Sequence, residues 1–428
     1  MTRQAGPPAG RPAGMARDEA PVPRPPGIAA GAAVTVIGMD GRPLVPVAAA
    51  RLASATLVVG ADRHLAAVDL PAAARTAVLG DVTVALAAIG AAGGPVVVLA
   101  SGDPGFFGIV RLLRDRGYRP EVLAGESSVA AAFARAGLPW DDALVVSAHG
   151  RALRRAANAC RAHPKVAVLT GPDAGPAELG AALAGQRRQL VVAERLGGPD
   201  ERITACTPAE AAASRWSDPN VVLVLAAAPP TAAAAGPGWV APRRQVPAGW
   251  ALPDEAFEHR DGMVTKAEVR AVALARLAPG LGDLVWDVGA GSGSVAVECA
   301  RFGAAVIAVD RDAAQCDRVR RNATVHSVEI EVVAGAAPGC LAGMPDPDAV
   351  YIGGGGPDVV AACAARAPGR IVVALASVDR VGPVRDLLRD AGYRTGGVLV
   401  QASRLVDLPA GGSRLAATNP VFVLDGHR

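Results

Sequence analysis

A glycine-rich segment in the second half of the chain carries the clearest chemical signal. Residues 286–294 read Trp-Asp-Val-Gly-Ala-Gly-Ser-Gly-Ser, between a predicted strand and a predicted helix. Alternate glycines let a ligand approach the backbone closely, and a helix N-terminus supplies free N–H donors. Asp310 follows about 20 residues later at the end of the next predicted strand, where a carboxylate can accept both hydroxyls of a ribose. The pattern indicates a binding site for a nucleoside cofactor.

The spacing of the glycines narrows the choice of cofactor. Counting from Gly289, the third position of the dinucleotide fingerprint falls on Ser294, and the spacing is instead Asp-x-Gly-x-Gly-x-Gly. This spacing resembles the first motif of the seven-stranded class I methyltransferases, which use S-adenosyl-L-methionine. The resemblance implies a Rossmann-like sheet, a glycine loop against the methionine part of the cofactor, and an acidic residue on the ribose. The cofactor-binding residues that it implies are Asp287, Gly289, Ala290, Gly291, Ser292, Gly293 and Asp310.

A second signal lies in the first half, where residues 99–108 read Leu-Ala-Ser-Gly-Asp-Pro-Gly-Phe-Phe-Gly. Ser-Gly-Asp-Pro after a buried strand predicts a tight turn that exposes backbone donors and a carboxylate at a sheet edge. The motifs of phosphoryl transfer, zinc proteolysis and serine hydrolysis are absent from the sequence. Methyl transfer needs little acid–base machinery, because alignment alone can supply about 7–11 kcal/mol of a barrier.

Composition sets the broad class. The 428 residues are 51% hydrophobic and 19% charged, which predicts two or three compact units with filled cores. A net charge of +3 gives no general attraction to nucleic acid or to anionic lipid. Six scattered cysteines without ligand spacing predict no metal site. The N-terminus lacks the apolar stretch of a secretory signal, so we expect a cytoplasmic protein without a membrane partner.

The elements that position these motifs follow an α/β pattern. Short β-branched runs alternate with helical patterns, which indicates strands buried on both faces. In the first half we expect strands at Val34–Ile37, Thr56–Val59, Val96–Leu99, Glu121–Leu123, Leu144–Val146, Val166–Leu169, Leu190–Ala193 and Asn220–Leu225. In the second half we expect a helix at Thr265–Leu277, a helix from Ser294, and strands at Leu284–Val288, Ala305–Val309, Ile330–Val333, Ala349–Ile352, Ile371–Ala374 and Val421–Leu424.

Changes in composition suggest the domain boundaries. Residues 1–31 are rich in Pro and Gly without apolar periodicity, and predict a disordered leader. A first domain is expected over residues 32–228 and a second over residues 248–428. Residues 229–247 between them lose periodicity and gain proline, as an interdomain linker does.

Six segments, which follow one another along the second domain, resemble the decarboxylating precorrin methyltransferase domain of cobalamin biosynthesis. They are Leu252–Phe257, Val264–Ala271, Asp287–Glu298, Gly335–Pro338, Tyr351–Gly356 and Thr418–Phe422. This resemblance places Thr265, Ala336 and Ala337 at the cofactor. The family often carries an acidic residue where this chain has Ala336, so backbone groups would serve there. The substrate side would be formed by Tyr351, Gly353 and Gly354. Lys266 is a catalytic candidate, and the alternative is a helix N-cap with a solvated amine.

Six segments of the first domain resemble the tetrapyrrole methylase family, which has a two-lobed α/β fold: Val34–Gly38, Leu99–Gly108, Gly125–Ser128, Gly137–Trp140, Ser147–Arg151 and Glu194–Glu201. The family usually opens with a longer Gly-x-Gly-Pro-Gly loop, whereas this chain has Gly-Met-Asp-Gly at 38–41. Contacts from that loop are therefore less defined. The cofactor-binding residues implied here are Gly38, Ser101, Gly102, Asp103, Gly108, Ser127, Ser128 and Thr170.

Two further candidates of the first domain concern the substrate. His149 is a candidate general base for the carbon being methylated, and the alternative is a histidine that orders a loop. Arg151, with Arg154 and Arg155 nearby, suits the carboxylates of a precorrin, and the alternative is a solvated helix face.

Together the resemblances imply an enzyme that methylates precorrin-6Y at carbons 5 and 15 and decarboxylates its ring C acetate. They imply a small-molecule substrate, no nucleic-acid partner and a homo-oligomer. Three alternatives stay open. One is a class I methyltransferase of RNA or protein with a non-catalytic N-terminal binding domain. Another keeps a single active domain because of the short opening loop, and the third is a nicotinamide-dependent reductase.

Overall fold

The computed structural model describes residues 33–80, 82–227, 249–260, 262–409 and 411–428. The expected leader and linker lie outside these residues. The chain forms two compact units: the first comprises residues up to Met39 and Pro43–Gly125, and the second comprises Asp40–Arg42 and Glu126–Arg428. Each unit is described by itself. No helix of the described residues is long and apolar enough to cross a membrane.

The first unit is built on a five-stranded parallel sheet with strand order β3-β2-β4-β1-β5. The three central strands are rich in valine, and their first four residues are buried on both faces, as is typical of parallel sheets. Helices α3 and α4 pack on one face and α1 on the other. The strands are β1 (Val34–Met39), β2 (Leu57–Gly60), β3 (Arg75–Val78), β4 (Val96–Ser101) and β5 (Glu121–Leu123). The helices are α1 (Pro46–Ala53), α2 (Asp62–Leu65), α3 (Val82–Gly90) and α4 (Ile109–Asp115).

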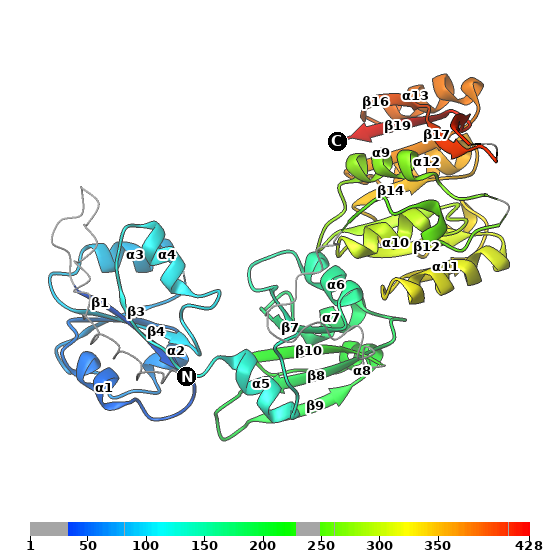
Figure 1. Ribbon diagram of the computed structural model, residues 1–428. Helices are drawn as coiled ribbons and strands as arrows, with labels where there is room; N and C mark the ends of the chain where they lie inside the picture. The colour runs from blue at the N-terminus through cyan, green and yellow to red at the C-terminus, as the bar shows by residue number, and fades with distance from the viewer. Residues whose placement is uncertain (1–32, 81, 228–248, 261, 410) are drawn as a thin grey trace, which may run out of the picture. The chain divides into compact units, whose positions relative to one another are not determined.

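The second unit begins with a mixed sheet of strand order β6-β7-β10-β8-β9 (Figure 1). β6 and β7 are parallel, whereas β10 runs antiparallel to both of its neighbours. Helices α6, α7 and α8 pack on one face and α5 on the other. The strands are β6 (Leu144–Ser147), β7 (Lys165–Leu169), β8 (Arg188–Glu194), β9 (Arg202–Cys206) and β10 (Asn220–Ala226). The helices are α5 (Ser128–Ala136), α6 (Leu153–Ala162), α7 (Pro176–Ala182) and α8 (Pro208–Ala213).

The same unit contains a seven-stranded sheet of order β13-β12-β11-β14-β15-β19-β16. The first five strands are parallel and β19 is antiparallel to β15 and β16. Helices α12 and α13 cover one face, and α9, α10 and α11 cover the other. The strands are β11 (Leu284–Val288), β12 (Ala305–Asp310), β13 (Glu331–Ala334), β14 (Ala349–Ile352), β15 (Arg370–Leu375), β16 (Arg394–Val400) and β19 (Val421–His427). The helices are α9 (Ala267–Leu277), α10 (Ser294–Arg301), α11 (Ala313–Val325), α12 (Pro357–Ala365) and α13 (Val381–Asp390).

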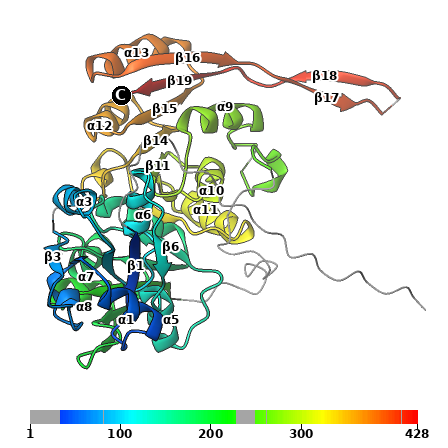
Figure 2. The ribbon, with the colours of Figure 1, turned by 90° about the vertical axis from the view of Figure 1, so that its left-hand side faces the viewer.

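The strand order reverses at β11, whose neighbours are β12 on one side and β14 on the other. In such doubly wound sheets a ligand binds at the carboxyl ends of the strands beside this reversal. Strands β17 (Ser403–Asp407) and β18 (Ser413–Ala417) form a separate antiparallel pair, which Figure 2 shows extending beyond β16 and β19. The fold class expected from the sequence, α/β with a Rossmann-like second half, is confirmed. Strands β3, β9, β16, β17 and β18 were not expected.

Candidate active site

Asp287 anchors the glycine loop at the carboxyl end of β11. The residue is 1% exposed, and its Oδ2 accepts the N–H of Ala296 in the first turn of α10 at 2.9 Å. Its Oδ1 is buried and has no hydrogen-bond partner among the described residues. Burial raises the pKa of this carboxyl to about 7. The site therefore holds a buried acceptor whose second oxygen is left for a ligand.

The glycines of this loop have different roles. Gly289, Gly291 and Gly293 all have left-handed backbones, with φ of +74°, +56° and +73°. A Cβ at Gly289 would lie 2.8 Å from the nitrogen of Gly354, and one at Gly293 would lie 2.9 Å from a methyl of Val319. A Cβ at Gly291 would enter open space. Packing therefore explains two of these glycines, and Gly291 leaves room for a bound molecule.

Asp310, the last residue of β12, is joined to this loop. Its Oδ2 accepts the N–H of Gly291 at 2.8 Å, and its Oδ1 accepts the N–H of Asp312 at 3.0 Å. Each carboxylate oxygen has two lone pairs, so both oxygens keep the capacity to accept a hydroxyl. The N–H of Gly335, just after β13, donates to the carbonyl of Asp310 at 2.9 Å. Ala336 and Ala337 therefore follow directly at the same edge of the sheet.

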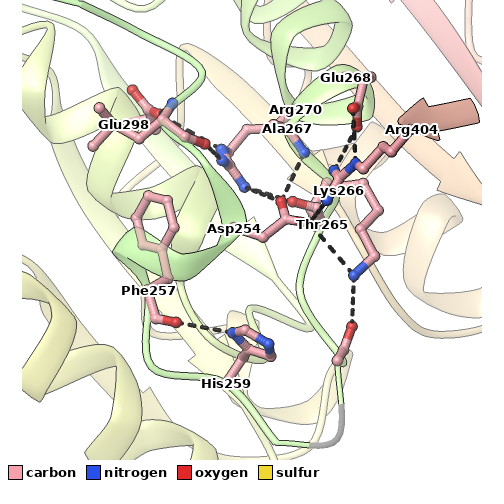
Figure 3. A network of polar contacts seen from close by, with 12 residues as sticks. Asp254, Phe257, His259, Thr265, Lys266, Ala267, Glu268, Arg270, Glu298 and Arg404 are labelled. Atoms are coloured by element: carbon pink, nitrogen blue, oxygen red, sulfur yellow. Dashed lines mark hydrogen bonds and ion pairs between the residues drawn. The ribbon is translucent and has the colours of Figure 1, made fainter. Parts of the chain in front are cut away.

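A buried arginine fixes the backbone at the start of α9 (Figure 3). Arg270 is 0% exposed, and its Nη1 donates to the carbonyl of Thr265 at 2.5 Å while its Nη2 donates to the carbonyl of Leu252. Its Nε lies 3.5 Å from Oε1 of Glu298, which is also fully buried. Desolvation lowers the pKa of this guanidinium and the nearby carboxylates oppose that shift. The network thereby sets the position of Thr265, whose Oγ1 lies 3.4 Å from the hydroxyl of Tyr351.

Lys266 belongs to the same network. It is the N-cap residue of α9, and its Nζ lies 3.4 Å from Oδ2 of Asp254 and donates to the carbonyl of Gly262 at 3.1 Å. Asp254 also accepts the N–H of Ala267 at 2.9 Å and forms an ion pair with Arg404 at 3.0 Å. Lys266 thus has the N-cap position of the alternative, but its amine is held by a carboxylate and a carbonyl instead of being solvated. A catalytic role for Lys266 stays a hypothesis.

A cavity of about 250 Å³ lies beside the glycine segment that follows β14. Gly353 and Gly354 line it, as expected for the substrate side, together with apolar residues of β15 and α13. Arg380 also lines it and donates from Nη1 to the carbonyl of Gly355 at 3.1 Å. Tyr351 is only 2% exposed and packs on the opposite face of the sheet, against α9 and α10. Burial raises the pKa of its hydroxyl.

In the first unit, the loops after β1, β4 and β5 meet through three glycines. A Cβ at Gly38 would overlap the carbonyl oxygen of Gly102 and the nitrogen of Gly125. The N–H of Gly102 donates to the carbonyl of Met39 at 2.7 Å, and that of Gly125 donates to the carbonyl of Gly102 at 3.2 Å. Gly38 and Gly102 thus lie together at the carboxyl edge of the parallel sheet.

The turn after β4 has the form that the sequence predicts. Oδ1 of Asp103 accepts the N–H of Gly105 at 2.8 Å, and a Cβ at Gly108 would overlap the carbonyl of Pro104. Ser101 is exposed, and its hydroxyl contacts Arg63 and His64 of α2. These two residues were not among the sequence candidates. The sequence feature that could have indicated Arg63 and His64 is their position directly after the buried strand β2.

The remaining candidates of the first domain lie in the second unit. Ser127 is the N-cap residue of α5 and Ser128 is its first residue. Oγ1 of Thr170 lies 2.6 Å from the carbonyl oxygen of Asn220, and the carbonyl of Thr170 lies 3.3 Å from Nδ1 of His149. His149 is exposed, and its contact with a backbone carbonyl fits the alternative in which this histidine orders a loop.

The arginines of the cluster that begins at Arg151 differ in their position and in their partners. Arg151 is exposed and precedes α6, whereas Arg154 within α6 forms an ion pair with Asp348.

No group of three or more metal-ligating side chains gathers among the residues that the structure describes. The roles of all these candidates in binding or catalysis remain predictions.

Comparisons with known proteins agree with this architecture. The model of the Tetrapyrrole (Corrin/Porphyrin) Methylases matches residues 37–212, and that of the Precorrin methyltransferase domain matches residues 255–420. The fold and the two glycine-rich sheet edges therefore define a methyltransferase with two methylase domains. A precorrin-6Y C(5,15)-methyltransferase [decarboxylating] from Sinorhizobium sp is 38% identical over 333 residues, which cover 75% of this chain and 76% of that protein. The chain belongs to the family of precorrin-6Y C(5,15)-methyltransferases (decarboxylating).

Two shorter relatives each carry one of the activities in that name. A probable cobalt-precorrin-6B C(15)-methyltransferase (decarboxylating) from Pyrobaculum calidifontis is 42% identical over 132 residues, 29% of this chain and 68% of that protein. A cobalt-precorrin-7 C(5)-methyltransferase from Salmonella typhimurium is 35% identical over 181 residues, 40% of this chain and 88% of that protein. These findings do not favour a methyltransferase of RNA or protein.

Proposed function

We propose that the enzyme transfers two methyl groups from S-adenosyl-L-methionine to carbons 5 and 15 of precorrin-6Y and decarboxylates its ring C acetate, as a step of cobalamin biosynthesis. The observation that carries this proposal is the presence, in one chain, of two domains whose families methylate tetrapyrroles and precorrins. We assign carbon 15 and the decarboxylation to the second domain and carbon 5 to the first. The separate C(15) and C(5) enzymes among the relatives support this division.

The second domain fits the proposed cofactor in three respects. The free Oδ1 of Asp287 is a buried acceptor, the space beside Gly291 is open, and Asp310 can accept two ribose hydroxyls. Thr265, held through its carbonyl by Arg270, lies at the start of α9. When bound, the cofactor supplies a methyl group on a sulfonium. The residues that would hold it are Thr265, Asp287, Gly289, Ala290, Gly291, Ser292, Gly293, Asp310, Ala336 and Ala337.

The cavity beside Gly353 and Gly354 is the proposed substrate side of this domain. Apolar side chains of β15 and α13 form part of its lining, and Arg380 offers a guanidinium to a substrate carboxylate. In the decarboxylation, the bond between the acetate methylene and the carboxyl carbon breaks, carbon dioxide leaves, and the electron pair enters a conjugated imine of the macrocycle. Residues of the chain have only to orient the acetate and keep the site dry.

In the first unit, the proposed cofactor contacts are made by the loops after β1 and β4, while Ser127, Ser128 and Thr170 are separate cofactor candidates of the second unit. The exposed hydroxyl of Ser101, beside a turn that Asp103 closes by accepting the N–H of Gly105, fits a polar ligand at the carboxyl edge of a parallel sheet. Gly38 keeps these loops together. Arg151 is the proposed contact to a precorrin carboxylate. A cytoplasmic location, the absence of a nucleic-acid partner and a homo-oligomeric state are part of the proposal.

Mass spectrometry tests the proposed function. Purified protein is incubated with precorrin-6Y and S-adenosyl-L-methionine that carries an isotopically labelled methyl group. We expect a product with two labelled methyls and one carbon dioxide fewer. One methyl gained with decarboxylation would leave the first domain inactive. An unchanged substrate would contradict the proposal and return attention to RNA or protein acceptors.

A further inference from the structure

A serine, a histidine and an arginine form a polar cluster at the carboxyl edge of the five-stranded sheet. Ser101 ends β4, and Arg63 and His64 lie in α2, which begins just after β2. Strands β2 and β4 are neighbours in this sheet, so their ends place the three side chains together. Nη2 of Arg63 donates to the hydroxyl of Ser101 at 2.9 Å, and Nε2 of His64 lies 3.2 Å from the same oxygen.

The three side chains differ in exposure and charge. Ser101 and Arg63 are exposed, whereas His64 is only 8% exposed and contacts the hydroxyl of Ser101 from its buried side. Desolvation, together with the charge of Arg63, lowers the pKa of His64 to about 4, so the imidazole is neutral near pH 7. In the tautomer with the proton on Nδ1, which is buried and has no hydrogen-bond partner among the described residues, Nε2 of neutral His64 can accept the hydroxyl proton of Ser101. The donor from Arg63 occupies a lone pair of the same oxygen and orients it.

The proposed function requires a proton acceptor at this domain. Carbon 5 of the macrocycle is a meso carbon that carries one hydrogen before methylation. When it receives a methyl group, it holds both substituents and the conjugation through it is interrupted. Conjugation returns when the C–H bond breaks, the electron pair of that bond enters the macrocycle, and the proton passes to a base.

We propose that Ser101 and His64 form this proton acceptor. The hydroxyl of Ser101 takes the proton from carbon 5 while its own proton passes to Nε2 of His64. Ser101 is then the catalytic residue, and His64 is a positioning residue that acts through it. The charge of Arg63 disfavours the imidazolium, so the proton is next released to solvent and the pair is reset. The inference rests on the proposed function and on the assignment of carbon 5 to the first domain.

The contrast with His149 supports this choice. His149 is exposed, and its Nδ1 lies 3.3 Å from the carbonyl oxygen of Thr170, a contact that orders a loop. His64, by comparison, lies behind an exposed hydroxyl on the motif that the tetrapyrrole methylase resemblance singled out. Two groups in relay at the sheet edge fit a proton transfer better than a histidine bonded to backbone.

The test uses the full chain and compares the two methylation sites within one product. Precorrin-6Y with hydrogen or deuterium at carbon 5 is incubated with methyl-labelled S-adenosyl-L-methionine. Methyl incorporation at each carbon and loss of hydrogen or deuterium from carbon 5 are followed by mass spectrometry and NMR. For His64→Gln we expect loss of hydrogen from methylated carbon 5, and with it formation of the conjugated product, to fall about 100-fold. The deuterium isotope effect at carbon 5 should rise, because proton removal becomes rate-limiting. Methylation at carbon 15 and release of carbon dioxide should stay at the wild-type rate.

Three variants complete the design. Ser101→Ala should show the same selective loss, and Ser101→Thr, which keeps a hydroxyl, should restore most of the rate. His163→Gln is the matched control. His163 is another histidine whose pKa burial lowers, but its Nδ1 lies 3.0 Å from the backbone carbonyl of Lys165 instead of a hydroxyl. This variant should leave the carbon 5 rate and its isotope effect unchanged.

Two results for His64→Gln would overturn the assignment. One is a rate of hydrogen loss from carbon 5 within about threefold of wild type with an unchanged isotope effect, because general-base assistance contributes far more than that. The other is an equal fall at both carbons, which would show that His64 serves folding alone. A wild-type protein that methylates neither carbon would instead overturn the proposed function, and this assignment with it.

Discussion

The carboxylate of Asp310 accepts the N–H of Gly291 at 2.8 Å, so the end of β12 and the glycine loop after β11 are joined by a charge-assisted hydrogen bond. The same carboxylate accepts the N–H of Asp312 through its other oxygen. One side chain therefore orders both the loop and the start of the segment that leads into α11. It does so without using all of its lone pairs, which leaves the proposed ribose contact possible.

Asp310→Asn should weaken cofactor binding in the second domain. The amide has one acceptor oxygen instead of two, so either the loop or the ribose loses a charge-assisted bond, each of which contributes about 1.5–3 kcal/mol. We expect the dissociation constant for S-adenosyl-L-methionine to rise about 10- to 100-fold for this domain, measured by calorimetry. Asp312→Asn is the control, because Asn caps helices as well as Asp does. Equal effects of the two variants would argue against a ribose contact.

The alanine variants of Gly291 and Gly293 should distinguish a glycine that leaves room for the cofactor from one that is required by packing. Both residues have left-handed backbones, so each variant carries a backbone cost of about 1–2 kcal/mol. Gly293→Ala should lose further stability, because its Cβ would lie 2.9 Å from Val319. Gly291→Ala meets no neighbour, and its main effect should be on cofactor affinity. Urea unfolding and calorimetry on both variants decide this, and a Gly291→Ala protein with wild-type affinity would contradict it.

Arg270→Met should destabilise the second domain strongly. The substitution removes the charge-assisted hydrogen bonds to the carbonyls of Thr265 and Leu252, each of which contributes about 1.5–3 kcal/mol, and leaves buried Glu298 with Arg301 as its remaining cation. Urea denaturation monitored by tryptophan fluorescence gives the free energy of unfolding. Arg276→Gln on the same helix is the control, because that arginine is half-exposed in its ion pair with Asp425 and should cost below about 1 kcal/mol. Similar losses in both variants would show that burial is not what matters here.

Stability should decline with pH through the titration of Asp287. Burial raises the pKa of this carboxyl to about 7 in the folded state, whereas an unfolded Asp titrates near 4. Between these values the folded state binds the extra proton, so the free energy of unfolding falls as pH rises. Relative to Asp287→Asn, the wild type should lose about 2–3 kcal/mol between pH 5 and pH 8. Denaturation of both proteins at the two pH values measures this, and parallel pH profiles would contradict the raised pKa.

The sequence predicted the buried centre of each sheet well and missed three of the edge strands, β3, β9 and β16. Leu284–Val288 and Ala349–Ile352 have the bounds expected for them, because central strands of a parallel sheet are unbroken apolar runs. Strands β3 and β9 lie at sheet edges and begin with arginine, so their patterns do not stand out from loops. The pairing of β17 with β18 uses largely exposed residues, which no core periodicity marks.

The candidate site divides along similar lines. The glycine loop and Asp310 meet as expected, because the carboxyl ends of neighbouring parallel strands lie at one edge. Tyr351 was expected on the substrate side, but it is buried against α9 and α10 while the next residue lines the cavity. Neighbouring residues of a strand point to opposite faces, and sequence alone did not show which face carries the cavity. The contact of His64 with Ser101 depends on which strands are neighbours, and no motif encodes it.

The three glycines that meet in the first unit also determine how this family motif can vary. Gly38 must stay a glycine, because any side chain would overlap the backbone of Gly102 and Gly125. The shortened Gly-Met-Asp-Gly loop retains that residue and departs from the family pattern only beyond it. The sheet edge therefore allows no replacement at Gly38. Gly41, farther along the loop, is also confined, because its Cβ would lie 2.4 Å from the carbonyl oxygen of Gly197. The shorter loop therefore leaves the contacts among Gly38, Gly102 and Gly125 in place.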